Sequence, residues 1–300
     1  MNLAVIGECM LELAPVSTGQ YRLNYGGDVL NTAVHVARTG IETAFFTILG
    51  DGYHSDWLVN AWQKEGIDCR EVQSLPGAEP AIYMIRNNDD DGDRHFHYWR
   101  SASPFKFWLS DEGYREQLPK KLAQFDHLHY SGITLAMLSE QDRDRLLALL
   151  ADYRHQGGSV SFDPNYRPRL WSSKDEAIFW LDRVYANADI AFPSLEDETL
   201  LRQSDSIEEI IDSLNKTGLK DLVVKTGANG CWIHNGGAAQ HIPVSQKIHA
   251  VDTTGAGDAF NAGYLVARFN RADRVAAANA GHNTATGVLH YHGAIISRDD

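Results

Sequence analysis

A chain of 300 residues can bury a large hydrophobic core, as one large domain or as a domain with a small addition. Its 40 acidic and 27 basic residues give a formal net charge of −13, which argues against nucleic acid or an anionic membrane as the main partner. Cys9, Cys69 and Cys231 stand apart without a C-x-x-C pair, as expected for free, buried thiols in a reducing cytoplasm. We expect no signal peptide, because residues 1–7 lead straight into an apolar strand, and no apolar run approaches the length of a transmembrane helix.

Short apolar runs alternate with longer amphipathic segments along most of the sequence. Because parallel strands need a crossover helix between them, this alternation predicts an α/β fold with a mostly parallel sheet covered on both faces. Ligands of such sheets bind beyond the carboxyl ends of the strands. The expected strands are residues 3–7, 43–49, 127–132, 159–163, 190–193 and 222–225, and the expected helices follow Asn31, Asp56, Glu140, Lys174, Ser206 and Asp258.

Two extended regions lack intervening helices and do not fit a parallel core. One is residues 11–25, and the other is a pair of strands at 80–86 and 94–100. A polar turn joins this pair, and its acidic residues 89–93 are typical of a solvated hairpin tip. We therefore predict a small β lid over the main domain. The expected division is an α/β core of residues 1–11, 26–78 and 109–300 and a discontinuous β lid of residues 12–25 and 79–108.

A glycine pair, Gly26 and Gly27, precedes the first expected helix and is followed by Asp28 and Asn31. Glycine lets the backbone approach a ligand closely, and the two polar side chains can bind hydroxyl groups. The alternative is a glycine turn whose helix is capped by Asp28.

In the expected lid, Tyr98 and Arg100 are two residues apart on one strand and therefore share a face. Tyr83 of the preceding strand is expected on the same face. Two tyrosines and an arginine over a pocket suit a polar substrate that carries a carboxylate. The alternative is an exposed amphipathic strand.

Cationic side chains follow two core strands. Arg167 and Arg169 come just after residues 159–163, where a guanidinium can bind carboxylate or phosphate through two hydrogen bonds. A surface ion pair is the alternative, and it is favoured for Arg169. Lys225 ends another strand before a glycine turn and can meet phosphates, unless the turn only forms a β-hairpin into residues 231–234.

Two H-x-H pairs, His95 with His97 and His127 with His129, lie on expected strands. No third and fourth ligand accompanies either pair, so packing or surface positions are favoured over a metal site.

Residues 251–260 give the strongest indication of chemistry. They place Gly255, Ala256, Gly257 and Asp258 where a loop turns into a helix. Unpaired N–H groups at a helix start bind anions, and glycine lets a phosphate approach them. Because a carboxylate would repel such an anion, Asp258 suggests a base beside a phosphoryl acceptor, and the segment indicates phosphoryl transfer to a hydroxyl. The alternative is an ordinary helix N-cap turn.

Together, the glycine pair with Asn31 and the segment 252–258 resemble the ribokinase-like, PfkB-type carbohydrate kinases, in this order and over essentially the whole chain. The resemblance implies a three-layer α/β/α core with a mostly parallel sheet and a small β-sheet lid. Within the family, the chain is similar to the kinases of 2-keto-3-deoxy sugar acids at residues 7–13, 97–100, 131–133, 163–171 and 293–296.

The resemblance also implies roles for the candidate residues. Asp258 would be the general base toward the terminal hydroxyl of a sugar acid. The N–H groups of Gly255, Ala256 and Gly257 would hold the charge of the transferring phosphoryl group. The substrate would contact Gly27, Asn31, Tyr83, Tyr98, Arg100 and Arg167, with both arginines facing its carboxylate. ATP would lie along Asn165, Lys225, Gly227, Gly230, Gly255 and Gly257, with Asn283 near the adenine.

The resemblance implies Mg²⁺ with ATP but names no direct ligand, because residues 194–197 replace the N-x-x-E motif of many relatives. Glu12 matches an acid that binds a sugar hydroxyl in relatives. A K⁺ ion near Asp252 and Thr254 stays open. The lid implies a homo-oligomer.

Three other functions remain open. A kinase of fructose or ribose would be distinguished by Arg100→Ala and Arg167→Ala, because the carboxylate assignment is wrong if neither variant impairs use of a sugar acid. A noncatalytic sugar-binding sensor would bind without releasing ADP. A nicotinamide oxidoreductase is opposed by Phe260, which stands where the last glycine of a G-x-G-x-x-G fingerprint belongs. A G-x-x-x-x-G-K-[ST] loop is also missing.

Overall fold

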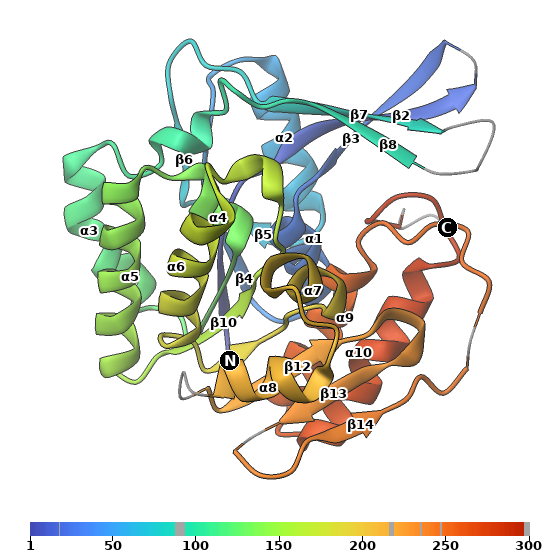
Figure 1. The fold of residues 1–300 in the computed structure, drawn as a ribbon. Helices are drawn as coiled ribbons and strands as arrows, with labels where there is room; N and C mark the ends of the chain where they lie inside the picture. Colours follow the sequence, from blue (N-terminus) through green and yellow to red (C-terminus); the bar gives the residue numbers. More distant parts are fainter. Residues whose placement is uncertain (18, 88–93, 216–218, 235, 247, 297–300) are drawn as a thin grey trace.

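The computed structural model describes residues 1–300 except 18, 88–93, 216–218, 235, 247 and 297–300. Within the described residues the chain forms a large sheet of ten strands and a smaller sheet of four that projects from one side (Figure 1). The order of the large sheet is β14-β13-β12-β11-β10-β9-β1-β4-β5, and β6 also pairs with β4. Its strands are β1 (Leu3–Ile6), β4 (Thr43–Leu49), β5 (Ile67–Asp68), β6 (Val72–Ser74), β9 (His127–Ser131), β10 (Ser159–Asp163), β11 (Ile190–Ala191), β12 (Asp221–Lys225), β13 (Cys231–His234) and β14 (Gln240–Ile242).

The strands from β12 to β5 run parallel, and β13 and β14 are antiparallel additions at one edge. This confirms the predicted α/β fold with a mostly parallel sheet. The turn after Lys225 does lead into an antiparallel hairpin, as the alternative interpretation of that segment held.

Helices cover both faces of the large sheet because side chains of its strands alternate between two cores. In β1, Ala4 and Ile6 belong to the core under α3 to α8, whereas Leu3 and Val5 belong to the core under α1 and α2. Helices α9 and α10 cover the β12–β14 end of the sheet. The helices are α1 (Asp28–Ala37), α2 (Tyr53–Lys64), α3 (Glu112–Leu122), α4 (Gly132–Met137), α5 (Glu140–His155), α6 (Lys174–Tyr185), α7 (Leu195–Arg202), α8 (Ile207–Asn215), α9 (Ala256–Phe269) and α10 (Arg274–Val288).

Several helices start earlier than predicted, and others were not predicted. Helix α1 begins at Asp28, not after Asn31, because Gly27 is its N-cap, and α9 begins at Ala256, not after Asp258. Periodicity in the sequence did not indicate helices α3, α4, α7 and α10 or the short strands β5, β6 and β14. Of these, α4 is a six-residue helix set by a capping box at Ser131, too short for its periodicity to show in sequence.

The smaller sheet, which we call the lid, has the order β3-β2-β7-β8. Its strands are β2 (Met10–Ser17), β3 (Gln20–Gly26), β7 (Ala81–Asn87) and β8 (Arg94–Trp99). Two antiparallel hairpins are joined through the parallel pair of β2 and β7. Residues 11–25, predicted as one extended piece, are thus a hairpin, and the predicted acidic tip at 89–93 lies outside the described residues.

Phe105 and Trp108, which fall within the range assigned to the lid, are buried in the main core. The cysteines are free, as expected, but Cys69 is only half-buried, unlike Cys9 and Cys231. None of the helices described here combines the length and the apolar character needed to cross a bilayer.

Candidate active site

Asp258 lies in the first turn of α9, directly after the glycine turn of residues 255–257. Gly255 has a φ of +74°, in the region that favours glycine, and a Cβ there would lie 2.4 Å from the Cβ of Ala294. The turn therefore depends on glycine for both its conformation and its packing. Of the three N–H groups expected to face a phosphoryl group, that of Ala256 already donates to the Thr253 carbonyl at 3.2 Å.

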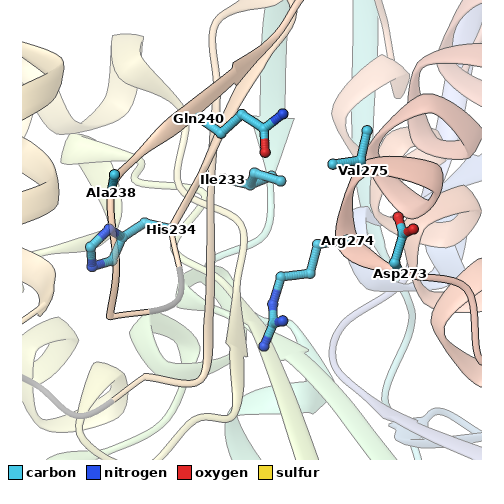
Figure 2. A pocket seen from close by; sticks show the side chains of 7 residues that line it. All are labelled: Ile233, His234, Ala238, Gln240, Asp273, Arg274 and Val275. Carbon is cyan, nitrogen blue, oxygen red and sulfur yellow. The ribbon is translucent and has the colours of Figure 1, made fainter.

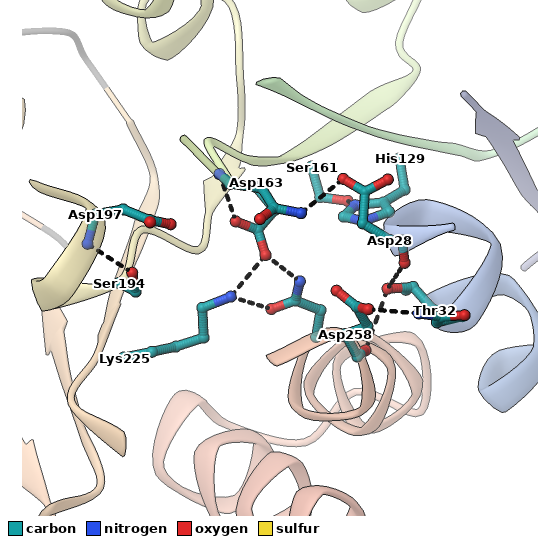
Figure 3. A network of polar contacts seen from close by, with 12 residues as sticks. Asp28, Thr32, His129, Ser161, Asp163, Ser194, Asp197, Lys225 and Asp258 are labelled. Carbon is teal, nitrogen blue, oxygen red and sulfur yellow. Dashed lines mark hydrogen bonds and ion pairs between the residues drawn. The ribbon is translucent and has the colours of Figure 1, made fainter. Parts of the chain in front are cut away.

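The Asp258 carboxylate is half-buried and lies among polar side chains, not in an apolar interior (Figure 3). Asn31 donates its Nδ2 to Asp258 Oδ2 at 2.8 Å, and the Thr32 hydroxyl donates to the main-chain carbonyl of Asp258 at 3.1 Å. Burial, followed by the negative charge of Asp28, raises the pKa of Asp258 well above its usual range, while the Asn31 hydrogen bond acts to lower it. A raised pKa makes the carboxylate a stronger proton acceptor.

Asn165 connects α1 to the loop after β10. Its Nδ2 donates to Asp28 Oδ2 at 2.8 Å, and its main-chain N–H donates to Asp163 Oδ1 at 3.0 Å. Its φ of +36° is a left-handed conformation that asparagine tolerates better than most residues. The local fold thus brings the start of α1 and the carboxyl end of β10 together beside Asp258.

Lys225, at the end of β12, lies in a compact polar cluster with Asp163 and Asn261. Its Nζ is 2.6 Å from Asp163 Oδ2 and 3.2 Å from Asn261 Oδ1, and Asn261 Nδ2 donates to the same Asp163 oxygen at 2.6 Å. A Cβ on Gly257 would lie 3.4 Å from Lys225 Nζ, so the ammonium group rests against the glycine turn. Burial acts to raise the pKa of Asp163, but the charge and hydrogen bond of Lys225 outweigh it and lower that pKa.

The lid brings its predicted residues onto one face. Tyr83 and Tyr98 are directly paired across β7 and β8, with ring centroids 5.9 Å apart, and the Arg100 guanidinium lies 5.5 Å from the Tyr98 ring centre. Arg100 also forms an ion pair with Glu8, a side chain that is 3% exposed. A second buried acid, Glu12, accepts hydrogen bonds from Tyr83 and Asn24.

Gly27 sits where two of these regions meet. A Cβ on it would lie 2.5 Å from the carbonyl oxygen of Glu8, so only glycine allows this approach of backbone to backbone. It also immediately precedes Asp28 and the helix that carries Asn31. The loop after β1 and the start of α1 therefore join the lid residues to the surroundings of Asp258.

Arg167 is exposed and pairs with Asp197 at 3.3 Å. The surface ion pair expected for Arg169 is thus formed by Arg167, and Arg169 is exposed. Asp197 stands in the first turn of α7, where its N–H bonds the Ser194 hydroxyl at 3.0 Å, and burial raises the pKa of its carboxyl. Figure 3 shows Asp197 and Ser194 in the same view as Lys225 and Asp163.

No group of three or more His, Cys, Asp or Glu in the described part of the chain could hold a metal by itself. His127 and His129 are buried in β9, and His95 and His97 are exposed on β8, in agreement with packing and surface positions. A Mg²⁺ ion that is bound mainly by nucleotide phosphates needs only one or two protein carboxylates. Asp163, Asp197 and Asp258 all lie in this part of the structure (Figure 3).

Asp252, beside which a K⁺ ion was considered, has both oxygens engaged. Oδ1 accepts from the N–H and hydroxyl of Thr254 at 2.9 and 2.8 Å, and Oδ2 accepts from the N–H of Gly293 at 2.6 Å. The carboxylate therefore fastens the loop before the glycine turn to the C-terminal segment.

Three residues predicted along ATP lie apart from this cluster in the described part of the structure. Gly227 and Gly230 flank the tight turn between β12 and β13 with φ of +57° and +97°. Asn283 is exposed on α10.

A cavity of about 230 Å³ lies elsewhere, between β13, β14 and the start of α10 (Figure 2). Arg274 and Asp273 line it at the far end of the α9–α10 pair. Since α9 has 14 residues and is about 21 Å long, this cavity is well separated from Asp258.

Sequence reasoning missed Glu8, Thr32 and Asn261 as members of the site. Asn261 carried a signal, because it follows Asp258 by three residues and so shares its face of α9. Glu8 carried none beyond a charged residue at the end of an apolar strand.

The chain is similar to known proteins along essentially its whole length. The chain matches the pfkB family of carbohydrate kinases over residues 1–300. It is 40% identical over 305 aligned residues to the 2-dehydro-3-deoxygluconokinase of Escherichia coli K12, covering 99% of this chain and 98% of that one. A fructokinase of Klebsiella pneumoniae is 32% identical over 262 residues, covering 87% and 82% of the two chains.

Among solved structures, a ribokinase II from Escherichia coli in complex with ATP and Mg²⁺ superimposes with a TM-score of 0.83. The match covers 98% of this chain and 94% of that one at 23% identity, and it establishes a shared fold.

Proposed function

The chain belongs to the pfkB family of carbohydrate kinases, and from that premise we propose that it transfers a phosphoryl group from ATP to the terminal hydroxyl of 2-dehydro-3-deoxy-D-gluconate (2-keto-3-deoxygluconate), giving the 6-phosphate. The observation that carries the proposal is Asp258, placed at a glycine-lined helix start and held by Asn31. The likeness to the Escherichia coli 2-dehydro-3-deoxygluconokinase supports the choice of substrate.

Asp258 acts as the general base. It takes the proton from the acceptor hydroxyl as the oxygen attacks phosphorus, and its raised pKa favours that transfer. The Asn31 hydrogen bond to Oδ2 fixes the carboxylate and leaves Oδ1 to face the hydroxyl.

The phosphate side is formed by the glycine turn and Lys225. N–H groups at the start of α9 and the ammonium group beside Gly257 oppose the negative charge that the phosphoryl group carries. ATP supplies that group when it is bound, and the lysine and the glycine conformations fit a triphosphate. Asn165, Gly227, Gly230 and Asn283 are assigned to the nucleotide, and Mg²⁺ is assigned with it.

The sugar acid is assigned to the space between the lid and the start of α1. Tyr83, Tyr98 and Gly27 border it, and Arg100 and Arg167 supply charge for the substrate carboxylate. Because Glu8 pairs with Arg100, that guanidinium is held in place before any substrate arrives.

We also assign a second copy of this chain to the outer face of the lid. Tyr21, Leu23 and Trp99 are 43%, 36% and 57% exposed. They share the face opposite Tyr83 and Tyr98, since Trp99 pairs with Ile82 and Leu23 with Leu13. An apolar stripe of this kind favours burial between two subunits.

The test is ADP release over a panel of 2-keto-3-deoxygluconate, gluconate, fructose and ribose. Asp258→Asn should lower kcat by about 10²- to 10⁴-fold and leave substrate binding largely intact. The control is Asp56→Asn, which changes an exposed acid in the first turn of α2.

Near-wild-type turnover of Asp258→Asn would refute the base assignment. Preferred use of fructose would favour the fructokinase alternative, as would Arg100→Ala and Arg167→Ala variants that leave use of the sugar acid unchanged. Sugar binding with no ADP release from any substrate would favour a noncatalytic sensor.

A further inference from the structure

Asp163 is a buried carboxylate at the carboxyl end of β10 to which the proposed reaction gives no role. We propose that Asp163, together with Asn261, is a positioning residue that holds the Lys225 ammonium group against the glycine turn, where it meets the phosphates of the nucleotide. The inference rests on the proposed function in that it takes the glycine turn as the phosphate site.

The three side chains form a closed ring of hydrogen bonds. Lys225 donates to both partners, and Asn261 donates in turn to Asp163, with donor–acceptor distances of 2.6, 3.2 and 2.6 Å. Asp163 is 6% exposed and Asn261 1% exposed, so water does not compete for these bonds. The long lysine side chain, which is normally mobile, is thereby fixed at its charged end.

The fixed ammonium group points at the glycine turn. A Cβ on Gly257 would lie 3.4 Å from Nζ, at van der Waals contact, so the ammonium group lies directly beside this residue of the turn. A lysine without these partners would lose conformational entropy when the nucleotide binds. A lysine that is already fixed by Asp163 and Asn261 does not incur this cost on binding.

The same carboxylate also sets the neighbouring turn. Asp163 Oδ1 accepts the Asn165 N–H at 3.0 Å, and the Asn165 side chain donates to Asp28 at 2.8 Å. Asp163 is thus tied at once to the nucleotide side and to the helix that carries Asn31.

A matched structural carboxylate exists at the other end of the sheet. Asp189 is 4% exposed and pairs with Arg154 and Lys220, but it precedes β11 and so lies at the amino ends of the strands. It offers a buried carboxylate paired with cations, away from the carboxyl ends of the strands where ligands of such sheets bind.

The experiment compares Asp163→Asn, Lys225→Met, the double variant and Asn261→Ala in the full chain. Isothermal titration with Mg²⁺ and a non-hydrolysable ATP analogue, and separately with AMP, measures affinity, and thermal unfolding measures stability. We expect Asp163→Asn to lower the affinity for the ATP analogue about tenfold, which is the size of one charge-assisted contact, and to change the affinity for AMP little. The double variant should bind no more weakly than Lys225→Met, because Asp163 acts through that lysine.

Asn261→Ala keeps the charges of Asp163 and Lys225, so it tests the ring of hydrogen bonds even if Asp163→Asn folds poorly. It should lower the affinity for the ATP analogue by less than Asp163→Asn does. Asp189→Asn should lower the unfolding temperature and leave ATP-analogue affinity unchanged. The inference is overturned if Asp163→Asn lowers the affinity for AMP and for the ATP analogue equally. It is also overturned if the affinity losses of Asp163→Asn and Lys225→Met multiply in the double variant, or if Asp189→Asn lowers the affinity for the ATP analogue as much as Asp163→Asn does. Wild-type protein that binds the analogue but phosphorylates no sugar acid would reject the proposed function alone.

Discussion

At the scale of single residues, the pKa of the proposed base, Asp258, depends on a second carboxylate. Asp28 lies near Asp258, and its negative charge adds to burial in raising the pKa of Asp258 (Figure 3). Asp163, also negative, acts in the same direction, and Lys225 acts against it. A base must be deprotonated to work, so the acidic limb of the activity profile reports this pKa.

We predict that Asp28→Asn moves the acidic limb of kcat/KM to lower pH. Removing a like charge stabilises the ionised Asp258 and lowers its pKa. The measurement is kcat/KM between pH 4.5 and 8, with Asp56→Asn as the control that should keep the wild-type limb. A limb that stays in place, or moves to higher pH, would show that Asp258 does not set it.

At the scale of elements, α9 and α10 pack closely through glycines. A Cβ on Gly263 would lie 2.3 Å from the Thr284 hydroxyl and 2.7 Å from the Ala280 carbonyl, whereas a Cβ on Gly287 would meet nothing within 4 Å. Since Asp258 stands at the start of α9, a shift of this helix moves the base.

Gly263→Ala should therefore destabilise the protein by about 1–3 kcal/mol and lower kcat, because the added methyl group forces the two helices apart. Gly287→Ala, also within a helix, should be neutral or stabilising by about 1 kcal/mol. Chemical denaturation and turnover of both variants provide the comparison. Equal stability of the two would mean that the helices repack freely.

The lid makes a separate prediction. Trp99→Asp should convert a dimer into a monomer, because it places a charge in the apolar stripe assigned to the subunit contact. Light scattering after size-exclusion chromatography gives the mass directly. Phe179→Asp, at an equally exposed aromatic residue on α6 of the core, is the control for a general effect of added charge and should keep the wild-type mass. A wild-type monomer, or a Trp99→Asp dimer, would rule out this contact.

The sequence predicted the parallel core, the small second sheet and the glycine turn before Asp258, since periodicity and glycine turns are local signals. The sequence could not predict which distant side chains form ion pairs with one another. Lys225 and Asp163 are 62 residues apart, and Arg100 and Glu8 are 92 apart. Spacing indicates the face on which a charge lies, but only the packed sheet determines the opposite charge that meets it. For this reason Arg100 was assigned to a substrate carboxylate without its buried counterion.

At the scale of the whole molecule, stability should depend on pH through two buried histidines in β9. Burial lowers the pKa of His127 to about 3 and that of His129 to about 4. In an unfolded chain each titrates near pH 6.5, so between about pH 6.5 and 4 the unfolded state binds more protons than the folded state. The contribution of these histidines to the free energy of unfolding is therefore complete above this pH window and is lost as the pH falls through it.

Replacing one histidine should flatten this dependence. In His127→Phe, which keeps a ring against Phe269, the loss of stability between pH 6.5 and 4.5 should be smaller than in the wild type, by about 1.4 kcal/mol for each unit of pKa shift within that range. Urea denaturation at several pH values measures it, and His155→Phe at an exposed site serves as the control. Identical slopes for His127→Phe and the wild type would show that His127 does not contribute.

The lid is assembled from two stretches of chain that α1, β4, α2, β5 and β6 separate, and the Glu8–Arg100 pair joins the loop before β2 to the residue after β8. Anyone wishing to graft another specificity onto this scaffold would thus have to transplant both stretches and their charged junction together. Exchanging either stretch alone would leave Glu8 or Arg100 without its ionic partner and would disturb the central parallel pairing of β2 with β7.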